Sequence, residues 1–208
     1  MERPTASGVL RNGGATDTMK TAAAWLLRVL ARPFDLLMGP RIFQWLLRTF
    51  TRASALTETE KAAAQDVLGG GAVAWDKVVV AQGGLLRLAF RLNGNRAFTT
   101  FHTINLPETG SHTRVNLDIV VHELVHVLQF ERVGSRYAGE ALGAQEAAGY
   151  GYGGPEGLRR DRDAGKHLRD YNREQQGQIA QDYFMCVRDG SDTSAYDPLI
   201  AELRASDI

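Results

Sequence analysis

The sequence is poor in cysteine and has no long apolar run. Cys186 is the single cysteine among 208 residues, so no internal disulfide can form and nothing indicates an oxidising compartment. Arginines interrupt every stretch that approaches the roughly 20 apolar residues needed to cross a bilayer, so we expect no membrane-spanning helix. A clear signal-peptide core and cleavage site are also lacking, which favours a cytoplasmic or peripheral membrane protein.

The chain has no excess of charge of either sign. Lysine plus arginine and aspartate plus glutamate number 24 each. We therefore expect no strong field of one sign, and a nucleic acid is not predicted as a partner. The length suits one globular domain with a sizeable core and one additional segment.

The N-terminal third differs in composition from the rest. Residues 1 to 18 are rich in small and polar types and predict a disordered leader. Residues 19 to 52 carry basic side chains among large apolar ones, which is typical of short basic amphipathic helices that lie on an anionic membrane surface or on a partner. Alternatively, their apolar residues pack on the main domain, which we place at 53 to 190. A C-terminal tail is expected at 191 to 208.

Periodicity and turn signals predict a mainly helical α+β domain with a small sheet. Thr57 and Glu60 have the spacing of a capping box, which opens a helix that ends at the glycines 69 to 71. Short stretches rich in β-branched and aromatic residues predict strands at 77–81, 97–101 and 103–106. Further helices are expected at 85–92, 136–148 and 172–188.

The segment Val121 to Gly134, VHELVHVLQFERVG, carries the chemistry. It belongs to a helix expected over 116–133, which places His122 and His126 one turn apart on one side. Two imidazoles in this position can bind one zinc ion at about 2.0 to 2.1 Å, and Glu123 can act on a metal-bound water as a general base. The alternative is a pair of ordinary core histidines. Because an unpaired buried polar group costs about 1 to 3 kcal/mol, the metal site is favoured.

A catalytic zinc site needs a third protein ligand and an open fourth position. The residue six positions after His126 is Arg132, so an elongated motif with a third histidine is absent. Glu140 and Glu146 lie on the next expected helix, and Glu174 begins the last one. Spacing alone leaves these three glutamates open.

The order of these motifs, with AFTTF, TINLP, HELVHVLQ, EQQGQI and DYF, resembles a family of small bacterial HExxH proteins of the gluzincin-like kind. Members occur beside contractile injection systems and polymorphic toxins, and the resemblance covers roughly Leu56 to Val187. It implies a zincin-like domain with an HExxH active-site helix, in which His122 and His126 bind zinc and Glu123 is the base. The third ligand that it implies is Glu174.

The same resemblance gives roles to residues outside this helix. An edge strand within Phe98 to Asn105 would bind an extended substrate peptide through main-chain hydrogen bonds. His102, Tyr171 or Tyr183 would stabilise the developing oxyanion.

The function predicted from the sequence is thus that of a zinc metallopeptidase acting on a peptide or protein substrate. The alternative is a non-catalytic zinc-containing scaffold or assembly protein, docked through residues 19 to 52 on a membrane surface or on a secretion or injection apparatus. Glu123 favours the enzyme, because a purely structural zinc site has no need of a general base.

Overall fold

The computed structural model describes residues 45, 49, 51 to 84, 86 to 134 and 149 to 208. These residues form six α-helices and one four-stranded sheet, which confirms the predicted α+β class. The strands are β1 (Arg52–Ala55), β2 (Val79–Gln82), β3 (Phe98–Thr100) and β4 (Thr103–Asn105). The helices are α3 (Glu58–Leu68), α4 (Leu86–Leu92), α5 (Leu117–Val133), α7 (Gly154–Asp163), α8 (Arg173–Asp189) and α9 (Asp197–Arg204).

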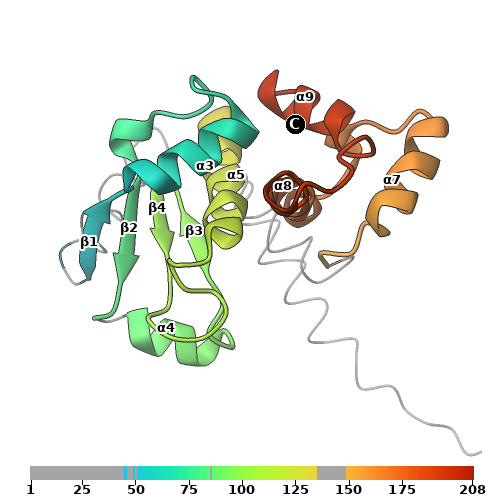
Figure 1. The fold of residues 1–208 in the computed structure, drawn as a ribbon. Helices are drawn as coiled ribbons and strands as arrows, with labels where there is room; N and C mark the ends of the chain where they lie inside the picture. Colours follow the sequence, from blue (N-terminus) through green and yellow to red (C-terminus); the bar gives the residue numbers. More distant parts are fainter. Residues whose placement is uncertain (1–44, 46–48, 50, 85, 135–148) are drawn as a thin grey trace, which may run out of the picture.

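The sheet has the strand order β1-β2-β4-β3, so β3 is an edge strand of the described sheet. β2 pairs with β4 in parallel, while β1 with β2 and β3 with β4 are antiparallel. The β3–β4 register sets Thr99 opposite Ile104. Helix α5 packs against both β3 and β4, and Figure 1 shows it standing between the sheet and α8. The predicted strand at 77–81 begins later, at Val79, because Trp75–Lys77 forms a 3-10 turn.

The two central helices, α5 and α8, lie side by side and make the most extensive contact between helices. Helix α8 opens with a capping box in which Asn172 accepts a hydrogen bond from the backbone N–H of Gln175. It ends at Gly190, which adopts the left-handed conformation that favours glycine. Helix α3 opens with the predicted Thr57–Glu60 capping box. Local capping signals therefore define where these helices begin and end.

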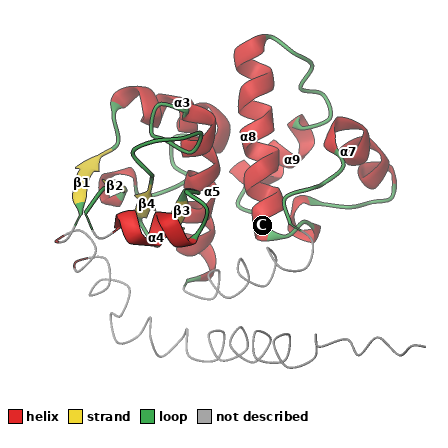
Figure 2. Ribbon diagram, turned by 90° about the horizontal axis from the view of Figure 1, so that it is seen from below, coloured by secondary structure: helices red, strands yellow, loops and turns green. Residues whose placement is uncertain are grey.

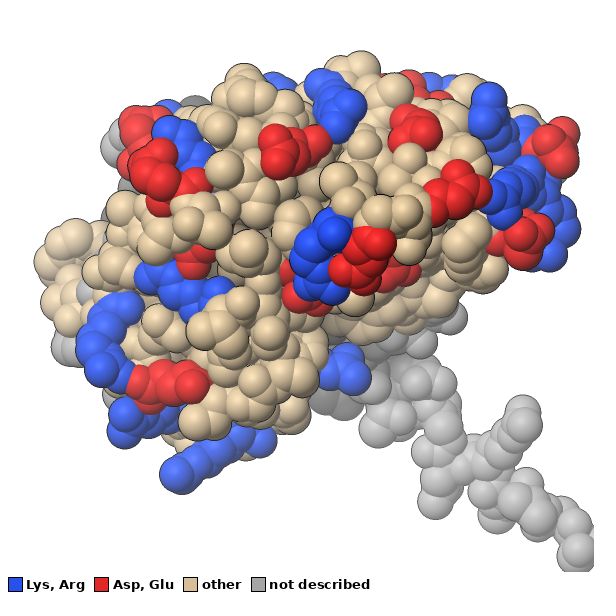
Figure 3. Space-filling view, in the orientation of Figure 1, with Lys and Arg blue, Asp and Glu red and all other residues tan. Residues whose placement is uncertain are grey.

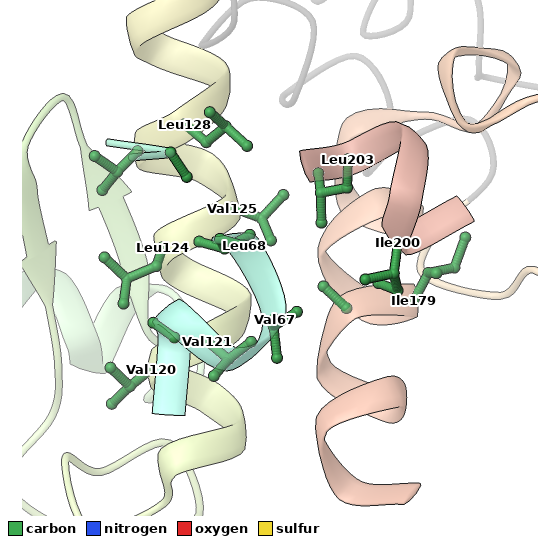
Figure 4. Close-up of a cluster of buried hydrophobic side chains, with 14 of the residues drawn as sticks. Val67, Leu68, Val120, Val121, Leu124, Val125, Leu128, Ile179, Ile200 and Leu203 are labelled. Carbon is green, nitrogen blue, oxygen red and sulfur yellow. The ribbon is translucent and has the colours of Figure 1, made fainter. Parts of the chain in front are cut away.

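The core lies where α5 meets α3, α8 and α9. Val121 and Val125 of α5 are fully buried, and they lie opposite Ile179 of α8 and Ile200 of α9 (Figure 4). Burying a side chain of this size stabilises the fold by about 1.5 to 3 kcal/mol. The close packing fixes the distance between α5 and the start of α8.

The predicted C-terminal tail at 191 to 208 is wrong. Residues 197 to 204 form α9, whose Leu199, Ile200 and Leu203 are buried in the main core. These three side chains form one face of a helix, and removing them from water offsets the cost of ordering the segment. Helix α8 is therefore not the last helix, and the main domain continues past residue 190.

Several predictions fall outside the described residues. They are the leader at 1 to 18, nearly all of the basic segment at 19 to 52, and the helix at 136 to 148 with Glu140 and Glu146. None of the helices that the structure describes has both the length and the apolar character that crossing a bilayer requires. On the face drawn in Figure 3, positive and negative side chains are interspersed over most of the surface.

Candidate metal centre

His122, His126 and Glu174 converge between α5 and α8. Nε2 of His122 and Nε2 of His126 each lie 3.5 Å from Oε2 of Glu174. One ligand atom from each of the three residues falls within 4.8 Å of the other two, and all three side chains are buried. The sequence placed the two histidines on one turn of α5, and the packing of α8 brings the carboxylate to them. This group could hold a metal ion.

Gly177 allows α8 to approach α5 this closely. A Cβ atom at this position would lie 2.8 Å from Cε1 and 2.9 Å from Nε2 of the His122 ring. Such distances are shorter than carbon and nitrogen atoms tolerate, so a side chain here would push His122 away from Glu174. The glycine in EQQGQI is therefore required by the close contact with His122.

Gln129 fixes the orientation of the His126 ring. Nδ1 of His126 lies 2.8 Å from Oε1 of Gln129, and Nε2 of the same Gln129 amide donates to the carbonyl of Arg173 and to Oε1 of Gln176. Because the amide nitrogen is occupied as a donor, the amide oxygen must accept, and Nδ1 of His126 carries the hydrogen. Nε2, the atom that faces Glu174, is then free to bind a metal.

The group combines a buried carboxylate with two buried imidazoles, so a positive charge at its centre would stabilise it. Burial lowers the pKa of His126, but Glu174, with smaller contributions from Glu123 and Gln129, raises it to about 9. Burial likewise raises the pKa of Glu174, but the adjacent imidazoles of His122 and His126 hold it well below its usual range. Either a proton on one of the imidazoles or a bound metal ion would supply a positive charge, which offsets the repulsion between these electron-rich atoms.

The distances within this group are compatible with a bound metal ion. Nδ1 of His122 is buried, and no hydrogen-bond partner for it exists within the described part of the chain. The 3.5 Å separations are longer than the 2.7 to 2.9 Å of a good charge-assisted hydrogen bond. Three ligands from rigid helices with no close hydrogen bond between them leave room for an ion at their centre.

Glu123 borders a cavity beside this group. The hydroxyl of Thr99, on strand β3, donates to Oε2 of Glu123 at 2.8 Å. The cavity has a volume of about 240 Å³, and His122 and Glu123 line it together with Tyr150 and Arg96. The carboxylate that the motif predicts as a general base is therefore held in place by the edge strand and faces a space next to the metal-binding group.

Tyr150 is a site residue that the sequence did not single out. Its ring centre lies 5.9 Å from that of His122. Burial raises the pKa of Tyr150 to about 12, with a further contribution from the Glu174 carboxylate. The loop that carries it is tied to α8, because Asn172 donates to the carbonyl of Gly149 and Gln175 donates to that of Gly151. The only signal in the sequence is the tyrosine in the glycine-rich stretch GYGYGG, and glycines there indicate a turn rather than a site.

The three side chains proposed for the oxyanion lie elsewhere. Nε2 of His102 pairs with Oε1 of Glu131 at 2.9 Å, two turns along α5 from Glu123. Tyr171 donates to Asp161, and the ring of Tyr183 lies near that of Tyr196 in the core. None of the three lines the cavity beside Glu123.

Comparison with protein families, with curated proteins and with solved structures finds no match. The chemistry of the site therefore rests on the residues of this chain.

Proposed function

We propose that the protein is a zinc-dependent peptidase of zincin-like architecture. The observation that supports this most is the convergence of Glu174 with His122 and His126, next to a cavity that Glu123 lines. Two imidazoles and one carboxylate are a donor set that suits zinc, and three protein ligands leave a fourth position open. Structural zinc sites are instead closed by four protein ligands.

Several residues of the chain have separate roles in the proposed reaction. Bound zinc would acidify a water molecule and polarise the carbonyl of a peptide. Glu123 takes the proton of that water and passes it to the leaving amine, as a general base and then a general acid. Thr99 holds one oxygen of this carboxylate and leaves the other free for proton transfer. Gln129 keeps His126 in the tautomer that binds through Nε2.

The edge strand gives the substrate a place to bind. β3 pairs with β4 on one side, and it carries Thr99 next to Glu123. An extended peptide that adds to the other side of β3 would pass the metal-binding group, with main-chain hydrogen bonds supplying affinity. Tyr150, in place of His102 or Tyr183, then supplies the hydroxyl that donates to the developing oxyanion.

Cleavage by the zinc-loaded protein tests this proposal. The wild type and Glu123→Gln are incubated with a diverse peptide pool, and new termini are identified by mass spectrometry. We expect Glu123→Gln to keep zinc and the Thr99 hydrogen bond but to lose about 100-fold or more in rate. Equal cleavage by the two proteins would point to a contaminating protease. No cleavage by the zinc-loaded wild type would reject the peptidase.

A further inference from the structure

The cavity beside Glu123 is lined by a positive charge that the proposed chemistry does not use. Arg96 lines this cavity, and it is the only lysine or arginine among the described lining residues. Its guanidinium carbon lies 5.7 Å from the centre of the Tyr150 ring. The side chain is exposed and forms no ion pair with any acidic residue that the structure describes. Its hydrogen-bond donors therefore stay available to a ligand.

The position of Arg96 is fixed by its own backbone. Its N–H donates to Oδ1 of Asn93, and Nδ2 of Asn93 donates back to its carbonyl. These two bonds close the turn that leads directly into β3. Arg96 thus lies two residues before the edge strand that is proposed to bind the substrate.

Other charged residues also lie near the cavity. Glu174 and Glu123 together would balance a divalent ion in the metal-binding group. The carboxylates of Asp118 and Asp182 accept hydrogen bonds from the lining residues Gln181 and Gln178. Arg96 is the only lysine or arginine among the described residues that line the cavity, so it is the cation there that a substrate carboxylate could contact.

We propose that Arg96 makes this cavity selective for substrates that present a carboxylate close to the scissile bond. The proposal rests on the proposed function, whose substrate class it narrows to acidic peptides. A guanidinium binds a carboxylate through two parallel hydrogen bonds, and the face of Tyr150 orients the guanidinium for this contact. The carboxylate comes from an aspartate or glutamate side chain or from the C-terminus of the substrate.

Peptide binding tests this selectivity without cleavage. Zinc-loaded Glu123→Gln is titrated with labelled eight-residue peptides that are acetylated and amidated, in which one glutamate is scanned through a neutral sequence. A second set carries glutamine at the same positions, and a third carries glutamine with a free C-terminus. Affinity is measured by fluorescence anisotropy at low and high salt.

We expect the best glutamate peptide to bind about tenfold more tightly than its glutamine counterpart, because a carboxylate forms a charge-assisted hydrogen bond with the guanidinium and an amide does not. The preference should weaken with salt, since Arg96 is exposed. Arg96→Gln in the same background should abolish it, while Arg91→Gln, which removes an exposed arginine of α4, should leave it. Tighter binding of the third set alone would assign the carboxylate to the C-terminus of the substrate.

Equal or unmeasurable binding of all three sets would overturn the inference, as would a preference that survives Arg96→Gln. Its failure is distinguishable from failure of the proposed function. If the wild type cleaves peptides without regard to acidic residues, only the selectivity is wrong. If acidic peptides bind through Arg96 but none is cleaved, only the hydrolysis is wrong.

Discussion

Two clusters in this protein combine a buried glutamate with nitrogen donors, and they differ in how closely their atoms are paired. In the first, Arg114 donates to both oxygens of Glu60, at 2.5 and 2.7 Å, and the N–H of Thr57 donates to Oε2. The remaining Arg114 donors reach Ser54 and the carbonyl of Ala55. This cluster is saturated by the protein itself.

The second cluster is incomplete. Its imidazoles lie 3.5 Å from the Glu174 carboxylate, and Nδ1 of His122 has no partner among the described residues. Glu60 and Glu174 are both buried, but Arg114 is partly exposed, whereas both imidazoles of the second cluster are buried. Donors that converge at these distances without a close hydrogen bond between them are compatible with a bound metal ion. A structural ion pair closes on itself.

Removing the metal should lower the free energy of unfolding, and this is the largest effect expected to depend on one cluster and not on the other. A ligand at 1,000 times its dissociation constant stabilises the native state by about 4 kcal/mol, so a chelator should lower the free energy of unfolding by about that amount. Urea unfolding in zinc and in chelator measures it. His126→Ala should show no such difference, while Glu60→Gln should retain it. Equal unfolding midpoints for the wild type in the two conditions would refute this prediction.

Gln129 tests whether the metal-binding group depends on its supporting hydrogen bond. Gln129→Met removes the acceptor of the His126 Nδ1 hydrogen, and a lost partner of this kind costs about 10- to 100-fold in metal affinity. Competition with a chromophoric chelator measures the change. Gln65→Met on α3 serves as the control. An unchanged affinity in Gln129→Met would mean that the ring needs no such orientation.

A substitution at Gly177 tests whether stability and metal binding depend on the close approach of α5 and α8. Gly177→Ala should destabilise the protein by about 1 to 3 kcal/mol and weaken metal binding, because its Cβ would overlap the His122 ring. Alanine normally stabilises an open helical position by up to about 1 kcal/mol, so the expected sign is opposite to that of helix propensity. Gly70→Ala, which has free space, should change metal affinity little. A Gly177→Ala variant that is more stable than the wild type and binds the metal with the same affinity would contradict this geometry.

The Glu60 cluster should respond to pH rather than to metal. Burial raises the pKa of Glu60, but the hydrogen bonds from Arg114 and Thr57 outweigh it and hold the pKa below the ordinary value of 4.5. A lowered folded-state pKa contributes stability above the unfolded-state pKa, and this is lost as pH falls through the folded-state value. Glu60→Gln should therefore cost about 1 to 2 kcal/mol at neutral pH and less in acid, measured by urea unfolding. A cost that is independent of pH would argue against the ion pair.

Local sequence signals predicted much of the fold and part of the site. The capping box of α3 and the spacing of His122 and His126 are local features, and the structure confirms them. Glu174 was selected by resemblance, since its approach to His122 depends on packing that α8 reaches through Gly177. Residues joined only by tertiary contacts were missed. Tyr150 lies in a loop held by α8, and α9 was read as a tail because its three apolar side chains gain stability only once they are buried.

The most direct test of the metal centre is the number of zinc ions per chain. Wild type, Glu174→Ala and Glu140→Ala are purified side by side, confirmed folded by circular dichroism, and measured by elemental analysis after zinc loading and removal of free metal. The account predicts one zinc ion per chain in the wild type and in Glu140→Ala, and a strong loss in Glu174→Ala. Full zinc in Glu174→Ala, or none in the wild type, would contradict it.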